Sequence, residues 1–220
     1  MNLSDWVVVF DLDDTLISER EYERSGISAV EKCVSSLYGS PFEGRIQGAR
    51  DAGIQDLWTW TCEQLDLPLE VKKSLLWIYR LHHPRISLPD LVRTLIERLA
   101  LKGSQLVILS DGRSVTQRLK LRAVGLEDWP VFLSEDYQSL KPAPERFEEI
   151  EKQWPRRRYV YVGDNPTKDF IAPLSRSWLT IGARWIFPRV HAIPADIDLS
   201  FQPHYWCDDP LDVDKILSLV

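Results

Sequence analysis

The chain has 220 residues, of which 44% are hydrophobic and 27% are charged, as is usual for one large globular domain or one domain with an insertion. Its net charge of −6 argues against general nucleic-acid binding, which needs a clustered basic surface. No apolar run is long enough to span a membrane and no secretory signal is visible, so we expect a cytoplasmic protein.

The first predicted element is a buried strand, WVVVF, which ends at Phe10. Three acidic residues follow it within four positions, namely Asp11, Asp13 and Asp14. Carboxylates placed so close together repel one another unless a cation lies between them. The residues alone therefore allow two interpretations, a solvated acidic turn or a set of ligands for a metal ion.

Residues 17–87 predict helices without strands, at about 20–38, 50–66 and 69–81, joined by segments that contain Gly and Pro. We expect a helical domain inserted between the first and second strands. Arg45, Gln47 and Arg50 lie in a Gly-flanked loop of this insertion. They are candidates for contact with a substrate, and a solvated surface is the alternative.

From residue 88 onward, predicted strands alternate with helices, which is typical of a doubly wound parallel sheet of the Rossmann-like α/β class. The strands end at Ser110, Ser134, Gly163 and Ala183, and the helices cover 88–103, 114–126, 142–154 and 210–219. The segment 185–209 is interrupted by prolines, and we expect it to be mostly loop.

Small polar and acidic residues directly follow the three strongest strands. They are Asp11, Asp13 and Thr15 after the first, Ser110, Asp111 and Gly112 after the second, and Asp164, Asn165 and Asp169 after the third. In an open parallel sheet the ligand binds outside the carboxyl ends of the strands, so we expect these residues to share one site. The basic run 156–158 precedes a strand and is expected at the opposite edge, facing solvent.

Four motifs occur in order in this framework, DLDDTL, LSDG, LKPAPERF and VGDNPTKD. In these motifs the chain resembles the haloacid dehalogenase-like hydrolases, a superfamily dominated by Mg²⁺-dependent phosphatases. The resemblance covers residues 1–16 and 88–220, for which it implies a Rossmann-like catalytic core. It also implies that the insertion, residues 17–87, is a helical cap.

The resemblance implies a role for each acid and for one lysine. Asp11 would be the nucleophile that forms an aspartyl-phosphate, and Asp13 would protonate the leaving oxygen and then activate water. Lys141 would place a positive charge beside the nucleophile and the phosphate. Mg²⁺ would be held by the carboxylates of Asp11 and Asp164 and by the backbone carbonyl of Asp13.

The remaining motif residues would support this site. Ser110, with the backbone N–H groups of Asp111 and Gly112, would hold phosphate oxygens at the start of a helix. Asp169 would orient Lys141 or a metal-bound water, Thr15 would fix the turn that carries Asp13, and Asn165 would support the loop. Arg113 follows the phosphate-binding turn, where it either reaches the substrate or forms a surface salt bridge.

We therefore expect a Mg²⁺-dependent phosphatase that acts on a small phosphorylated metabolite, with sugar phosphates as the first class to test by analogy with capped relatives. A phosphomutase that uses the same residues is one alternative, and a non-catalytic regulatory protein that kept the fold is another. A dehalogenase is disfavoured because it needs no proton donor at the position of Asp13. The sequence does not indicate the oligomeric state.

Overall fold

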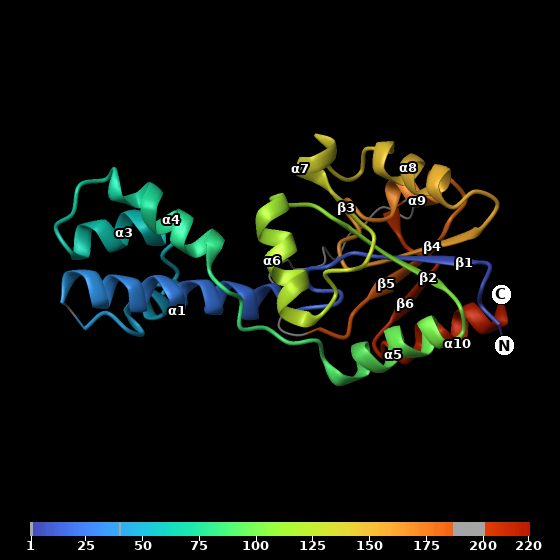
Figure 1. Cartoon of the computed structure of the whole chain (residues 1–220), viewed down its shortest axis with the longest axis horizontal. Coiled ribbons are helices and arrows are strands. Elements are labelled where there is room, and N and C mark those ends of the chain that lie inside the picture. Colours follow the sequence, from blue (N-terminus) through green and yellow to red (C-terminus); the bar gives the residue numbers. More distant parts are fainter. Residues whose placement is uncertain (1, 40, 187–200) are drawn as a thin grey trace. The chain divides into compact units, whose positions relative to one another are not determined.

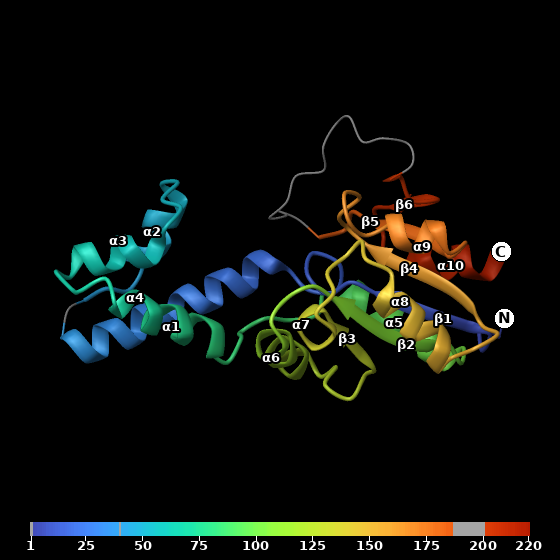
Figure 2. The same ribbon diagram turned by 90° about the horizontal axis from the view of Figure 1, so that it is seen from above.

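The computed structural model describes residues 2–39, 41–186 and 201–220, and the chain forms two compact units. Unit 1 comprises Met1–Glu19 and Ser87–Val220, and unit 2 comprises Arg20–Ile86. Figure 1 labels most of their helices and strands, and Figure 2 also labels α2. The predicted insertion starts at residue 17 rather than at Arg20 and ends at residue 87 rather than at Ile86. That unit 2 acts as a cap stays a prediction.

Unit 1 is built on a six-stranded sheet in the order β3-β2-β1-β4-β5-β6, in which every neighbouring pair is parallel. The strands are β1 (Trp6–Phe10), β2 (Gln105–Ser110), β3 (Val131–Leu133), β4 (Arg158–Gly163), β5 (Leu179–Ala183) and β6 (Tyr205–Cys207). The chain adds strands to one side of β1 and then to the other, so β1 lies at a switch point. The prediction of a Rossmann-like, doubly wound parallel sheet is confirmed.

Strand β1 is buried over all five residues because it is paired on both edges and covered on both faces. Val8 pairs with Leu106 on one side and with Val160 on the other. Val7 and Val9 belong to a core cluster that also contains Phe147 of one helix and Ala172 of another. Their neighbours in the strand point to the opposite face.

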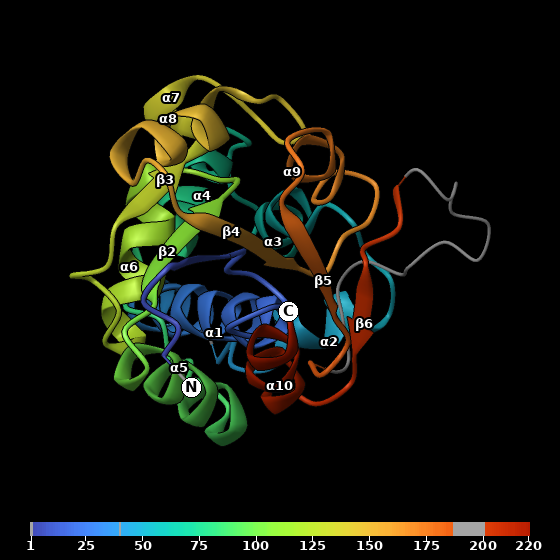
Figure 3. The ribbon, with the colours of Figure 1, turned by 90° about the vertical axis from the view of Figure 1, so that its right-hand side faces the viewer.

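Helices cover both faces of the sheet (Figures 1 and 3), with α5 beside α10 on one face and with α8 and α9 on the other. The helices of unit 1 are α5 (Asp90–Leu101), α6 (Ser114–Val124), α7 (Ser134–Tyr137), α8 (Glu145–Gln153), α9 (Ile171–Ser175) and α10 (Leu211–Leu219). Helix α5 buries Val92, Leu95, Ile96 and Leu99, an apolar stripe of helical period.

Three short elements of unit 1 were not predicted. Helices α7 and α9 have four and five residues, and β6 has three, which is too short for a periodic pattern. Strand β6 lies in the segment 185–209, which was expected to be mostly loop, so that expectation is wrong at residues 205–207. Residues 187–200 of the same segment lie outside the described residues.

Unit 2 contains α1 (Glu19–Tyr38, whose first residue belongs to unit 1), α2 (Arg45–Asp51), α3 (Leu57–Gln64) and α4 (Val71–Leu81), which Figure 2 shows from above. The helix predicted at 50–66 is two helices, because Gly53 has a φ of +89° and Asp56 caps the N-terminus of α3. Arg45, Gln47 and Arg50 consequently lie in α2, and their placement in a loop is wrong.

Unit 2 has a hydrophobic core of its own, which includes Val30, Phe42 and Ile46. Its two ends are joined, since the backbone N–H of Arg85 donates to the Ser25 hydroxyl at 2.8 Å. Among the described residues, no helix combines the length and the apolar character that crossing a membrane requires.

Candidate active site

Two cavities of unit 1 lie at opposite edges of the sheet. The smaller, about 70 Å³, is at the carboxyl edge, and Ser110, Asn165 and Lys168 contribute to its lining. Its acidic lining residues are Asp11, Asp13, Asp14, Glu19, Asp111 and Asp164. The larger, about 480 Å³, is at the amino edge and includes Trp6 and Arg158. The residues predicted for the site gather at the smaller cavity.

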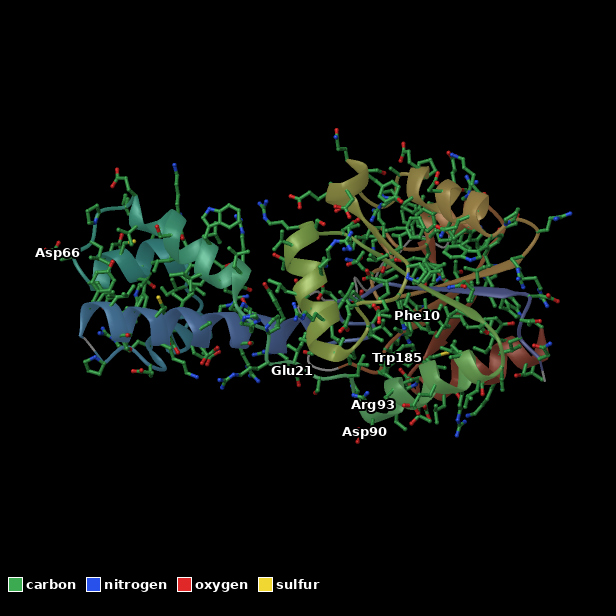
Figure 4. All side chains as sticks on the ribbon, in the orientation of Figure 1. Phe10, Glu21, Asp66, Asp90, Arg93 and Trp185 are labelled. Carbon is green, nitrogen blue, oxygen red and sulfur yellow. The ribbon has the colours of Figure 1, made fainter. Side chains whose placement is uncertain are left out.

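The turn after β1 is fixed mainly by backbone hydrogen bonds. Asp14 has a φ of +50°, its N–H donates to the Ile17 carbonyl at 2.7 Å, and its carboxylate accepts from the Glu19 N–H at 3.0 Å. Asp14 is buried, so it stabilises the turn and is not a solvated residue. The Thr15 carbonyl accepts from Trp185 Nε1 (Trp185 is labelled in Figure 4), whereas the Thr15 hydroxyl has no hydrogen-bond partner among the described residues.

Lys141, fully buried, lies between two acids of the site. Its Nζ is 2.9 Å from Asp11 Oδ1 and 2.7 Å from Asp169 Oδ1, and it donates to the Tyr161 hydroxyl at 3.0 Å. Asp169 is itself held by the N–H of Asn165, which donates to Oδ2 at 2.9 Å. The structure thus brings together four residues expected at the site, Asp11, Lys141, Asn165 and Asp169.

Asp11, Asp164 and Asp169 form a cluster of buried carboxylates, and one oxygen from each lies within 4.8 Å of the other two. Burial raises the pKa of Asp11, Lys141 lowers it and Asp169 raises it, and the net result is a pKa of about 6. Burial, with Asp11 and Asp169, raises the pKa of Asp164 to about 8. Burial lowers the pKa of Lys141, but Asp11 and Asp169 raise it further, well above its usual value. The single positive charge of Lys141 does not balance the three carboxylates, so the cluster keeps excess negative charge. Carboxylate oxygens are the ligands that a hard divalent cation prefers, and this set fits such an ion.

Asp13 contacts a different set of partners. Its carboxylate oxygens lie 2.7 and 2.9 Å from Lys120 Nζ, and Gln117 Nε2 donates to Oδ2 at 2.9 Å. Burial raises the pKa of Asp13, but Lys120 and Gln117 lower it further, so it is below its usual value. Gln117 and Lys120 were not among the residues predicted for the site. The signal was present, because residues 117, 120, 121 and 124 form the inward face of the predicted helix, and two of them are polar.

The loop after β2 presents fewer backbone donors than expected. Ser110 is buried, and its hydroxyl accepts from Gln117 Nε2 at 2.9 Å. The carboxylate of Asp111 accepts from Arg146 and from the N–H of Lys141, so this side chain faces the protein. The N–H of Gly112 donates to the Ser134 hydroxyl at 2.9 Å. The N–H of Gly112 is therefore not free to donate to a phosphate oxygen, and its prediction as a phosphate ligand is wrong for this structure. The hydroxyl of Ser110 and the N–H of Asp111 stay predicted phosphate ligands.

Four candidate substrate contacts have protein partners. Arg113 Nη1 lies 3.8 Å from Glu135 Oε1, and both side chains are more than half exposed. This contact matches the surface salt bridge that was the alternative for Arg113. In unit 2, Arg45 donates to Gln64 at 3.1 Å, Gln47 donates to Asp51 at 3.0 Å, and Arg50 pairs with Glu23 at 2.8 Å. Contact of any of the four with a substrate stays a prediction.

Comparison with known proteins gives one family and a group of similar structures. Residues 7–173 match the sequence model described as haloacid dehalogenase-like hydrolase. The HAD-hydrolase YfnB from Bacillus subtilis, bound to magnesium, is 19% identical, with 96% of this chain and 97% of that chain covered and a TM-score of 0.65. No curated protein matches the chain.

Two further structures represent different activities on the same fold. A HAD phosphatase from Thermococcus onnurineus is 23% identical over 99% of this chain and 98% of that chain, with a TM-score of 0.59. A 2-haloacid dehalogenase from Pseudomonas syringae pv. tomato DC3000 is 19% identical over 97% and 98%, with a TM-score of 0.63. At such identities the likeness concerns the fold alone.

Proposed function

The chain belongs to the haloacid dehalogenase-like hydrolases, and we propose that within this family it is a Mg²⁺-dependent phosphatase of a small phosphorylated metabolite. The observation that carries the proposal is the pair of carboxylates on one turn. Asp11 pairs with Lys141 and lies beside Asp164 and Asp169. Asp13, two residues after Asp11, pairs with a different lysine, Lys120. This arrangement provides a nucleophile and a proton donor at one cavity.

Phosphoryl transfer to Asp11 would be the first step. Lys141 fixes one oxygen of the Asp11 carboxylate and so orients the group for attack on phosphorus. Ser110 and the N–H of Asp111 would hold phosphoryl oxygens. Asp13 would give a proton to the leaving oxygen, and would then accept a proton from the water that hydrolyses the aspartyl-phosphate.

Asp11 and Asp164, with the backbone carbonyl of Asp13, would hold Mg²⁺, and Asp169 would orient the groups around it. Bound there, the ion would neutralise negative charge on the carboxylates and on the phosphoryl group. The raised pKa of Asp164 supports this assignment, because it arises from burial and then from the charges of Asp11 and Asp169, and a bound dication would offset both effects.

Two rival activities use the same fold. A dehalogenase needs no proton donor for a halide leaving group, so the placement of Asp13 in the cavity favours a phosphatase. A phosphomutase would need the aspartyl-phosphate to survive while the substrate reorients. We further propose a cytoplasmic location, since the three cysteines, Cys33, Cys62 and Cys207, are all free, as is usual in a reducing compartment.

The experiment is to incubate the full chain with a panel of phosphorylated metabolites, sugar phosphates included, and to measure phosphate release with and without Mg²⁺. D11N is the control for contaminating phosphatases. Release by the wild type alone supports the proposal. Transfer of labelled phosphate to a second position of the same substrate identifies a mutase, and halide release from 2-haloacids identifies a dehalogenase. No turnover of any ester would support the regulatory alternative.

A further inference from the structure

The inward face of α6 presents two polar side chains to the candidate site. Gln117 and Lys120 are 1% and 4% exposed, although glutamine and lysine are seldom buried without a partner. They are three residues apart and therefore lie on one face of the helix. Both contact the carboxylate of Asp13, Lys120 through both oxygens and Gln117 through Oδ2.

Gln117 also contacts the loop that follows β2. The same amide nitrogen lies 2.9 Å from Asp13 Oδ2, 2.9 Å from Ser110 Oγ and 3.0 Å from the Asp111 carbonyl. An amide nitrogen has two hydrogens, so it can serve Asp13 and Ser110 together. Ser110 Oγ accepts this bond, and its hydroxyl donates to the Asp111 carbonyl over a long 3.5 Å, a contact that a bound phosphoryl oxygen could replace.

The loop leaves room for this glutamine. Gly112 has a φ of +147°, and a Cβ added to it would lie 3.0 Å from Gln117 Nε2 and 3.1 Å from Gln117 Cδ. A side chain at this position would push the amide by a few tenths of an ångström. Glycine is therefore favoured here by the position of Gln117 as well as by the backbone conformation.

We propose that Lys120 and Gln117 are positioning residues. Lys120 orients the Asp13 carboxylate, and Gln117 sets the spacing between Asp13 and Ser110. The inference rests on the proposed phosphatase activity. The ester oxygen that must be protonated is bonded to the same phosphorus as the phosphoryl oxygen that Ser110 would hold, so the separation of Asp13 from Ser110 would set the alignment of proton transfer.

The proposed reaction has two steps. In the first, a bond forms between an Asp11 oxygen and phosphorus, the bond from phosphorus to the ester oxygen breaks, and Asp13, which must be in its protonated form for this step, gives its proton to that oxygen. In the second, a water oxygen bonds to phosphorus, its proton goes to Asp13, and the bond to Asp11 breaks. Lys120 and Gln117 exchange no proton and act only through the orientation of Asp13 and Ser110.

The test uses two esters that differ in the leaving group, an alkyl phosphate and 2,4-dinitrophenyl phosphate, whose phenolate departs without protonation. The measured quantity is kcat/KM, because it reports only the steps up to formation of the phospho-enzyme. K120M keeps most of the length of the side chain and removes its charge. K102M is the matched control, since Lys102 is a part-buried lysine on the far side of unit 1 that pairs with Asp214.

For K120M we expect kcat/KM to fall about 100-fold on the alkyl ester and less than ~3-fold on the dinitrophenyl ester, since general acid catalysis contributes about 10²–10⁴. K120R should recover most of the alkyl activity. Q117L should lose activity on both esters and raise KM, because Ser110 contacts the phosphoryl group in each. K102M should leave both values within ~2-fold of the wild type.

Equal losses on the two esters for K120M, in step with a lower melting temperature, would show that Lys120 only stabilises the fold and would overturn the inference. A gain in activity would overturn it too, because Lys120 would then hold Asp13 away from the substrate. If K120M does not fold, K120Q retains a donor for Asp13 and should show a smaller loss with the same dependence on leaving group. A wild type that releases no phosphate from either ester would refute the proposed function itself.

Discussion

The two edges of the sheet in unit 1 differ in whether their charged side chains are balanced by partners of opposite charge. At the amino edge, Arg158 donates to the Val220 carbonyl at 2.8 Å and Arg176 pairs with Glu148 and Glu151, so the cations have protein acceptors. At the carboxyl edge, acids outnumber cations. The pKa of Glu19 there is raised to about 7, mostly by burial and then by Asp13.

The difference shows which property identifies a site. The cavity at the amino edge is about 480 Å³ and that at the carboxyl edge about 70 Å³, so volume alone would select the wrong one. Uncompensated buried charge destabilises a fold and is kept where a ligand or a reaction needs it. Substitutions should therefore affect activity at the carboxyl edge and only stability at the amino edge.

The largest expected effect comes from D11N. Its amide cannot attack phosphorus, and uncatalysed hydrolysis of phosphate monoesters is so slow, with enzymatic accelerations up to ~10²¹, that no rate should remain. Circular dichroism should show an intact fold. R157A, at the amino edge, is the control and should keep full activity. A D11N enzyme with a tenth of the wild-type rate would remove Asp11 from its role.

The second test removes the metal or one of its proposed ligands. Activity should vanish in excess chelator and return when Mg²⁺ is added. D164A should raise the Mg²⁺ concentration for half-maximal activity by about 100-fold or more, because the site loses one of two carboxylate ligands. Calorimetric titration with Mg²⁺ checks binding without turnover. Full activity of the wild type in excess chelator would contradict the metal assignment.

A smaller effect is expected from unit 2, whose arginines have protein partners of their own. R45A or R50A should lower kcat/KM for the best metabolite by about 10-fold, or ~1.4 kcal/mol, and leave a small aryl phosphate unaffected. The control is R93A on α5 of unit 1, where Arg93 is exposed (labelled in Figure 4). Equal losses on both substrates would mean that the arginines support the fold of unit 2.

The smallest effect is on stability. The pKa of Asp164 is raised from 3.8 to about 8, so the folded state binds its proton more tightly than the unfolded chain does. The metal-free protein should therefore lose stability as the pH rises from about 4 to about 8. D164N removes this charge and should raise the melting temperature at pH 8 but not at pH 4. Each kcal/mol gained in the free energy of unfolding should raise the melting temperature by about 2–4 °C.

R176A is the matched variant at the amino edge. It removes two partly exposed ion pairs of about 0.2–1 kcal/mol each and should lower the melting temperature by no more than ~8 °C at either pH. Differential scanning calorimetry of both variants at the two pH values would decide. A D164N protein less stable than the wild type at pH 8 would show that Asp164 is already stabilised without a metal.

The parallel sheet and the position of the site could be predicted because apolar runs such as WVVVF end directly in acids, and the carboxyl ends of parallel strands meet at one edge. Lys120 was missed because its contact with Asp13 joins residues far apart in sequence, and the helical pattern shows only that it faces inward. Strand β6 could not be predicted because three residues are too few for a periodic pattern. The hydrogen bond from the Gly112 N–H to Ser134 could not be predicted because no local pattern indicates that Ser134 lies beside Gly112.

The central place of β1 has a consequence for how the chain folds. It precedes the other strands of the sheet in the chain, yet Val8 pairs with Leu106 and with Val160, so its last partner is made far later. Contacts of such long sequence separation form slowly, and an unpaired apolar strand invites aggregation meanwhile. Unit 2 has its own core and joined ends, so it can fold first and shorten the loop that β1 and β2 must close. The insertion would then assist folding on the ribosome, whatever it contributes to the finished protein.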